Sequence, residues 1–390
     1  MRIEAIMKKL VTVVGACAAA LLLAACGNLS FDTNSSGSTS STKTSSYTTT
    51  GTASDDTYQS VIEGGKYKVS KSRGLQLTEN TQNDNTYNVR SMENGLVDLS
   101  KKQFSTTKYL FEEGQLLSTS TLENWLGRYS SSNKLGLNPE DNGKTGENDR
   151  NPMYLQTVLE QDYMLQSGSK LKLGGVSVAL GMNSVDYYTK ESYGAQYSTT
   201  IPTATLTAKG KEMASKVVAR LRQKSSVGNS TPILIAIYKG NTQDALVGGT
   251  FVTYAVSKSG NSIASWNDVN EKNETLPVVN NKTPINSTVS NDFNTFESKV
   301  KSFFPKLAGV TAQAHYEKGQ LQGLNIDVTT QFYGQTEINS FTQYVVTAAS
   351  KYLPSDAEIQ INIKSVQQME AFAERKSGSK SFYTHVFSSY

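Results

Sequence analysis

Cys26 is the residue whose type and position point most clearly to chemistry. It is one of only two cysteines in this chain of 390 residues. Lys8 and Lys9 precede an apolar run from Leu10 to Ala25, and Cys26 follows the last residue of that run. A thiol is a good nucleophile once it is deprotonated. At this position, after a cut on its amino-terminal side, the sulfur could take a diacylglyceryl group.

The apolar run has the features of an export signal. It is about 16 residues long, whereas a helix needs roughly 20 to cross the hydrocarbon core of a bilayer. A basic start, a short apolar middle and small residues at the end are typical of a cleaved leader. The true start could be Met1 or Met7, because Met7 directly precedes the lysines.

The end of this leader resembles the lipobox of bacterial lipoproteins, in the order Leu23, Ala24, Ala25, Cys26. Small residues fit the signal peptidase, so we expect cleavage between Ala25 and Cys26 and a lipid on Cys26. Two alternatives are an ordinary signal peptide with an incidental cysteine, and a buried cysteine in a core helix.

Cleavage would leave one cysteine in the mature chain. Cys17 departs with residues 1–25, and the sulfur of Cys26 would carry lipid. The sequence then offers no disulfide and no thiolate for catalysis or metal binding, and we expect no cofactor. A single acyl chain binds membranes only marginally, so a diacyl anchor on the extracytoplasmic face of the cell membrane is the expected attachment.

Residues 26–57 follow as a predicted flexible tether. Ser, Thr and Gly dominate this segment, and few apolar side chains are present to offset the entropy lost on ordering. A chain of this length would hold the body roughly 30 Å from the bilayer. The formal charge of +4 falls to about +2 once Arg2, Lys8, Lys9 and Glu4 are removed. So small a net charge argues against nucleic acid as a partner.

One short motif suggests a serine enzyme. Ser105 and Lys108 have the SxxK spacing of penicillin-recognising enzymes, and Lys144-Thr145-Gly146 resembles a companion motif. The order along the chain is wrong, however, and the KTG triplet lies in a polar stretch. Chance matches are common in a chain this rich in Ser, Thr and Lys.

Two further groups suggest metals. Carboxylates gather between Asp141 and Asp149, which would suit calcium, but the EF-hand order is missing and a solvated loop is the alternative. His315 and His385 are the only histidines; they could bind zinc, although packed strand histidines are the alternative. We predict no metal site.

Several tyrosines suit either a binding surface for peptide or glycan or ordinary strand packing. They include Tyr187, Tyr188, Tyr193 and Tyr197.

Both helical and strand periodicities occur in the body. Helical spacing joins Met213, Val217, Val218 and Leu221 (with Thr207 as the expected cap), Phe293, Phe296, Val300 and Phe303, and a stripe from Ile338 to Leu353. Strand patterns cover residues 176–180, 233–237, 359–363 and 382–387, and a hairpin is expected where residues 312–316 meet 324–328 across Lys318-Gly319.

These elements predict an α+β fold with mixed or antiparallel sheets and helices packed on one face. The continuous apolar run at 233–237 is typical of a central strand. We expect a first lobe at 58–256, a polar linker or long loop at 257–290 and a second lobe at 291–390. The two lobes could also form one continuous domain.

Longer stretches of the body resemble one family, the CamS sex-pheromone precursor lipoproteins of Gram-positive bacteria. The resemblance lies in residues 125–128, 135–139, 154–163, 232–238, 352–354, 359–363 and 369–372, together with the lipobox and the tether. These stretches cover most of the chain after the tether.

The resemblance implies two products. In such precursors a small hydrophobic peptide, sensed by enterococcal donor cells, comes from the end of the leader. The corresponding residues here are Ala19, Ala20, Leu21, Leu22, Leu23, Ala24 and Ala25. They lack the isoleucine and phenylalanine of the family's active peptide, and the alternative is that they only end the apolar run.

We therefore expect a non-enzymatic surface lipoprotein. The membrane would be its partner through the diacylglyceryl anchor, and the body would bind a peptide, a glycan or a cell-wall component. The alternative is an envelope hydrolase that acts on peptide or glycan through paired carboxylates. A deep pocket with convergent carboxylates would favour the enzyme, whereas a shallow aromatic groove would favour binding.

Overall fold

The computed structural model describes residues 47–388, apart from 55, 74, 76–84, 86, 304–308 and 332–333. Residues 45–390 form one compact unit by their contacts. The predicted leader, Cys26 and residues 26–46 of the predicted tether lie outside the described residues.

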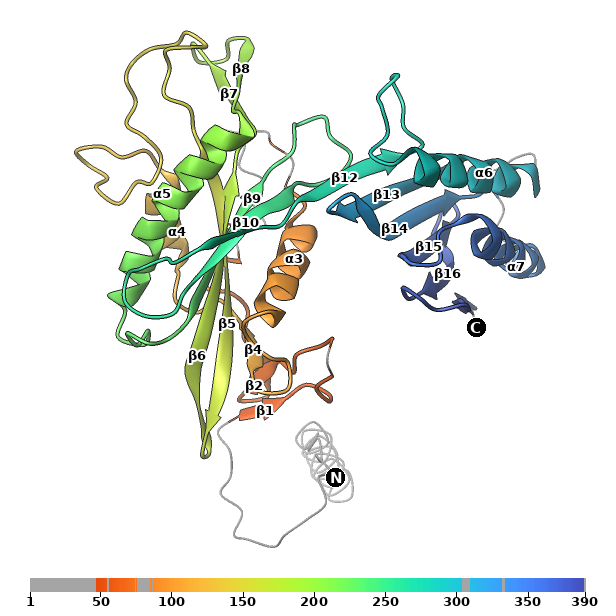
Figure 1. Ribbon diagram of the computed structural model, residues 1–390, viewed down its shortest axis with the longest axis horizontal. Coiled ribbons are helices and arrows are strands. Elements are labelled where there is room, and N and C mark those ends of the chain that lie inside the picture. Colours follow the sequence, from red (N-terminus) through yellow and green to blue (C-terminus); the bar gives the residue numbers. More distant parts are fainter. Residues whose placement is uncertain are drawn as a thin grey trace, which may run out of the picture. The chain divides into compact units, whose positions relative to one another are not determined.

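The first large sheet has six strands in the order β11-β10-β9-β6-β5-β4 (Figure 1). Its strands are β4 (Leu110–Glu113), β5 (Leu155–Ser167), β6 (Lys170–Met182), β9 (Ile233–Lys239), β10 (Thr250–Ser257) and β11 (Trp266–Asp268). β6 and β9 run parallel, and every other neighbouring pair is antiparallel. The sheet is therefore mixed.

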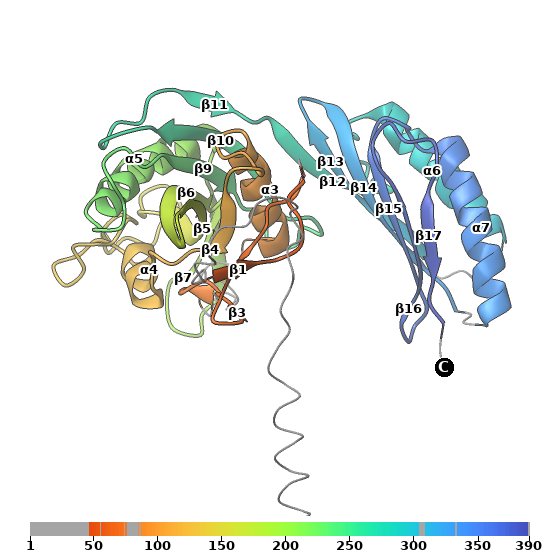
Figure 2. The same ribbon diagram turned by 90° about the horizontal axis from the view of Figure 1, so that it is seen from below.

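Helices cover both faces of this sheet (Figure 2). On one face, α4 (Thr119–Leu126) and α5 (Thr203–Arg222) share a core with Ile233, Ile235 and Ile237. On the other, α3 (Val89–Lys101) shares a core with Leu234, Ala236 and Tyr238. The unbroken apolar run of β9 follows from this arrangement, because side chains on both faces of the strand are buried. The sequence analysis expected helices on one face of a sheet, and within the described residues this arrangement occurs in the second large sheet.

The start of α5 differs from the expected cap. The helix begins at Thr203 after Pro202, and Thr207 lies inside its second turn. The Thr207 hydroxyl donates a hydrogen bond of 2.7 Å to the carbonyl of Thr203. Pro202 is the N-cap residue, with φ −55° and ψ 140°, and no side chain caps the helix there.

Two small sheets flank the first large sheet. β1 (Tyr47–Thr49), β2 (Val61–Glu63) and β3 (Lys66–Tyr67) form one, and the hairpin of β7 (Val185–Thr189) and β8 (Gln196–Thr200) forms the other. Tyr187, Tyr188 and Tyr197 belong to this hairpin, and Tyr193 is fully exposed in the turn that joins its strands.

The second large sheet has six strands in chain order, β12 to β17. They are β12 (Glu271–Leu276), β13 (Gly309–Glu317), β14 (Gln320–Thr329), β15 (Glu358–Lys364), β16 (Met369–Arg375) and β17 (Tyr383–Val386). α6 (Ser287–Phe303) and α7 (Gln335–Tyr352) lie side by side on one face (Figure 2). α7 connects β14 to β15, the only parallel pair of this sheet within the described residues. The α+β prediction is confirmed.

The predicted hairpin is also confirmed. Lys318 and Gly319 join β13 to β14 with φ values of 52° and 82°. Positive φ at both central residues defines a type I′ turn, which matches the twist of the flanking strands.

The predicted linker at 257–290 contains two strands. β11 pairs with β10 of the first sheet, and β12 pairs with β13 of the second. Only Val269 and Asn270 separate the two strands, and Asn270 has a φ of 59°. The proposed domain boundaries stay a prediction.

Candidate functional site

Two carboxylates lie side by side in the interior, Glu160 and Asp162 on β5. Residues two apart on a strand share a face, and their side chains are only 2% and 1% exposed. Gly114 lies against them, and a Cβ there would be 2.6 Å from the Cβ of Glu160. The segment 114–117, which follows β4, can therefore approach β5 closely.

Backbone amides of this segment bind both carboxyl groups. Leu116 N donates to Oε1 of Glu160 and Leu117 N donates to Oε2, both at 2.8 Å. Gln115 N donates to Oδ2 of Asp162 at 2.9 Å. These bonds pair three backbone amides of a segment that packs onto the sheet, where partly or fully buried amides need an acceptor.

The two carboxyl groups differ in their affinity for a proton. Burial raises the pKa of Asp162 well above its usual value, and the neighbouring charge of Glu160 raises it further. Burial also raises the pKa of Glu160, but its two amide donors oppose the rise. Asp162 therefore holds a proton more tightly than Glu160 does, and its Oδ1 is buried without a hydrogen-bond partner.

This is the pair of unlike carboxylates that the hydrolase alternative required. Three of its four oxygen atoms accept backbone hydrogen bonds, and the pair is shielded by segment 114–117. A general acid must reach its substrate to within hydrogen-bond distance. The geometry instead suits a structural role, in which the pair fixes segment 114–117 to β5.

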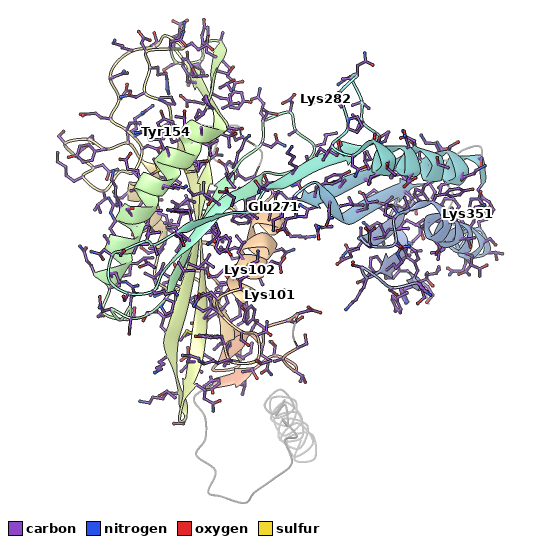
Figure 3. All side chains as sticks on the ribbon, viewed as in Figure 1. Lys101, Lys102, Tyr154, Glu271, Lys282 and Lys351 are labelled. Carbon is purple, nitrogen blue, oxygen red and sulfur yellow. The ribbon has the colours of Figure 1, made fainter. Side chains whose placement is uncertain are left out.

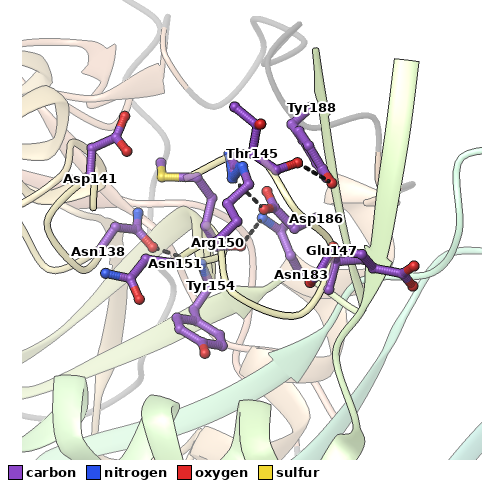
Figure 4. Close-up of polar contacts among 12 residues, drawn as sticks. Asn138, Asp141, Thr145, Glu147, Arg150, Asn151, Tyr154, Asn183, Asp186 and Tyr188 are labelled. Atoms are coloured by element: carbon purple, nitrogen blue, oxygen red, sulfur yellow. Dashed lines mark hydrogen bonds and ion pairs between the residues drawn. The ribbon is translucent and has the colours of Figure 1, made fainter. Parts of the chain in front are cut away.

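A second polar cluster holds the long loop between α4 and β5 (Figure 4). Arg150 Nη1 lies 2.8 Å from Oδ2 of Asp186, and its guanidinium lies 4.4 Å from the ring centroid of Tyr188. Tyr188 in turn donates to the carbonyl of Thr145 at 3.2 Å. The loop is thus attached to the β7–β8 hairpin by side chains from both.

Arg128 and Asn138 fasten the ends of the same loop. Arg128 donates to the carbonyls of Pro139 and Asn151 at 3.0 and 2.9 Å. Burial lowers the pKa of Arg128, and the charge of Arg150 lowers it further. Asn138 accepts from the amides of Tyr154 and Leu155, both at 2.8 Å. This loop contains the carboxylates considered for calcium, and Asp141 accepts from Gly143 N in a local turn.

The remaining sequence candidates lie apart. Ser105 bonds to Thr107 at 2.8 Å in a turn after α3, whereas Lys144–Gly146 belong to the long loop. His315 lies on β13 and bonds to Asn273, while His385 lies on β17. Four strand spacings of about 4.8 Å separate those two strands, too far for one metal ion. Among the described residues, no cluster of three or more His, Cys, Asp or Glu could hold a metal.

An open hollow of about 250 Å³ lies beside the carboxyl end of α3. Lys102 and Gln103, which follow α3, border it on one side. Tyr254 and Val256 of β10 line it together with Lys258, which directly follows that strand. Ala264, Ser265 and Asn267 complete the lining from β11 and the residues before it. Figure 3 shows Lys101 and Lys102 at the end of α3. We name this hollow the Lys102–Lys258 hollow.

The chemistry of this hollow is basic and aromatic. Lys102 Nζ lies 5.5 Å from the ring centroid of Tyr254, whereas Lys101 pairs with Asp98 at 2.8 Å. No carboxylate of the described residues lies within ion-pair distance of Lys102 or Lys258. The two free ammonium groups and the ring can receive a small anion. Sequence reasoning missed this site, although Tyr254 and Val256 lie on one face of β10 and Lys258 directly follows the strand.

The residues predicted for lipidation, cleavage and peptide release all lie outside the described residues. They are Ala19, Ala20, Leu21, Leu22, Leu23, Ala24, Ala25 and Cys26. Among the described helices, none is both long enough and apolar enough to cross a bilayer.

Comparisons of fold and of sequence both point to one family. A family model described as the CamS sex pheromone cAM373 precursor matches residues 67–381. A sex pheromone precursor from Lactobacillus salivarius subsp. salivarius UCC118, known from a crystal structure, is 49% identical with a TM-score of 0.84. That match covers 88% of this chain and 100% of the relative.

A second solved structure is the C-terminal domain of the sex pheromone staph-cAM373 precursor from Staphylococcus aureus. It is 30% identical with a TM-score of 0.68, and the match covers 79% of this chain and 99% of that domain. No curated protein matches the sequence. The chain therefore belongs to the CamS family, which confirms the resemblance noted in the sequence.

Proposed function

We propose that this protein is a surface lipoprotein with a non-enzymatic body that binds a component of the cell envelope. The observation that carries the proposal is Cys26, which directly follows a short apolar leader in a chain that belongs to the CamS family. Cleavage before Cys26 and diacylglyceryl attachment to its sulfur place residues 27–390 outside the cell.

The discarded leader has a second role in this proposal. Its last residues, Ala19 to Ala25, are uncharged and apolar, and further proteolysis releases them as a hydrophobic peptide pheromone. The two relatives with solved structures are both described as sex pheromone precursors, which supports this assignment.

Two features of the body support binding over hydrolysis. The carboxylate pair Glu160 and Asp162 is buried, and backbone amides occupy three of its oxygen atoms. The Lys102–Lys258 hollow is open and combines cations with an aromatic ring. Open hollows of this kind suit recognition of a polar ligand, whereas catalysis needs groups held close to the reacting atoms.

Cell fractionation of Cys26→Ala tests the anchor, with Cys17→Ala as the matched control. Without its sulfur the variant has no lipid, so we expect it in the medium, whereas Cys17→Ala stays in the membrane fraction. Retention of Cys26→Ala in membranes after a salt wash would refute the proposed anchor.

A further inference from the structure

We propose that the Lys102–Lys258 hollow binds a phosphate-bearing polyol, presented as a phosphodiester-linked chain in the envelope. This inference deepens the proposed binding function and rests on it. The ligand class follows from three features of the hollow, namely its unpaired cations, its aromatic wall and its size.

The cations define the charge of the ligand. Lys102 directly follows α3 and Lys258 directly follows β10, so they border one hollow from two different parts of the chain. Neither has a carboxylate partner among the described residues, whereas the adjacent Lys101 is paired with Asp98. Both lysines line the same hollow, and lysine is a common phosphate ligand, so the hollow suits a phosphate group.

The carboxyl group of Glu271 lies close enough to Lys102 for the charge of Lys102 to lower its pKa, but burial has the larger effect and raises that pKa to about 7. Its Oε2 accepts a hydrogen bond of 2.8 Å from Phe251 N. Near neutral pH Glu271 is therefore only partly charged, and its carboxylate is already engaged by the backbone.

The wall of the hollow suits a polyol or sugar next to the phosphate. Tyr254 and Val256 lie on the same face of β10 and are half-buried, so they offer an apolar surface to C–H groups. Asn267 is the cross-strand partner of Tyr254, so both side chains lie on one face of the sheet. Gln103, Ser265 and Asn267 supply hydrogen-bonding groups for hydroxyls.

The size of the hollow fits one repeat unit. A space of about 250 Å³ is smaller than the pockets that enclose drug-sized ligands. One phosphate and one short polyol would fill it, and the binding of a single unit would be weak. A chain of identical units raises the local concentration of ligand, because a released unit is replaced by its neighbour.

The test uses the chain without residues 1–26, since residues 45–390 form a compact unit with their own cores. Calorimetry measures its binding to soluble oligo(glycerol phosphate) and to inorganic phosphate. The site variant is Lys102→Gln with Lys258→Gln. The control is Lys282→Gln with Lys351→Gln, which removes the same charge from other elements (Figure 3).

We expect the wild type and the control variant to bind the oligomer with equal affinity. The site variant should bind roughly tenfold more weakly, as the loss of two partly exposed ion pairs implies. Tyr254→Leu should weaken binding of the oligomer but leave inorganic phosphate unaffected. Equal losses in the site and control variants would overturn the proposal, because binding would then follow net charge alone.

Vesicles of phosphatidylglycerol separate a lipid headgroup from a soluble chain. Sedimentation of the protein with vesicles in the absence of any oligomer binding would overturn the proposal in favour of the lipid. Lack of binding to both would also overturn it. The fractionation of Cys26→Ala is independent of these measurements, so the proposed anchor and this site can fail separately.

Discussion

Arg150 and Asp186 form a buried ion pair that joins the long loop before β5 to strand β7. Arg150 Nη1 lies 2.8 Å from Oδ2 of Asp186, and the two side chains are 16% and 1% exposed. Burial raises the pKa of Asp186, while the charge of Arg150 opposes that rise. The pair therefore stabilises this loop mainly because each charge compensates the other.

Asp186→Asn should lower the free energy of unfolding by about 2–4 kcal/mol, because it leaves the Arg150 charge without its partner. Urea denaturation measures this change. Glu212→Gln on α5 is the matched control, since Glu212 pairs with Lys209 and Lys216 at the surface. Its cost should stay below about 1 kcal/mol. Similar costs for the two variants would contradict the buried pair.

Glu271 should make stability depend on pH. Burial raises its pKa from 4.5 to about 7, Glu317 and Asp98 raise it as well, and the Phe251 amide and Lys102 oppose them. The folded chain thus holds a proton that the unfolded chain releases above pH 4.5. Stability from this group is complete at low pH and is lost as pH rises from about 4.5 to 7.

Glu271→Gln should therefore flatten the fall of the melting temperature between pH 4.5 and 7. The amide oxygen of Gln can still accept from Phe251 N. Glu358→Gln, at an exposed position of the same sheet, should keep the wild-type slope. Part of the slope should persist in Glu271→Gln, because Asp162 also has a raised pKa. An unchanged slope in Glu271→Gln would disprove this assignment.

The ring of Phe104 leaves no room for a side chain at position 175, which is glycine. A Cβ at Gly175 would overlap that ring, which stacks on Tyr163 with centroids 4.6 Å apart. Gly175→Ala should cost about 1–3 kcal/mol through overpacking, as measured by thermal and urea unfolding. In Gly323→Ala the new Cβ would lie 3.5 Å from the Glu358 carbonyl, an ordinary contact. If Gly175→Ala is no more destabilising than Gly323→Ala, the packing account is wrong.

The peptide prediction concerns residues 19–25. Synthetic AALLLAA at micromolar concentration should induce clumping or conjugation in responsive enterococcal donor cells. A peptide of the same composition in scrambled order is the control and should be inactive. No response to AALLLAA would refute its role as a pheromone.

The local elements were predictable because local patterns determine them. The apolar run at Ile233–Ile237 predicted a central strand, and Lys318-Gly319 predicted a hairpin turn. The apolar stripes that end at Phe303 and at Leu353 correspond to α6 and α7. Thr207 was misplaced as a cap because Thr203, beside Pro202, begins the helix first.

Neither the carboxylate pair Glu160 and Asp162 nor the Lys102–Lys258 hollow could be predicted, because each is built from segments far apart in the chain. Gln115 meets Asp162, and Lys102 meets Tyr254, only after the sheet has formed. The spacing of residues within one segment does not predict such long-range contacts. Cys26 was recognisable for the opposite reason, since leader and thiol are adjacent in sequence.

Intact-protein mass spectrometry of material from the native host tests the central claim most directly. The account predicts a chain that begins at Cys26 and carries the mass of a diacylglyceryl group on that residue. A free thiol at Cys26, or a mass that still includes residues 1–25, would contradict it.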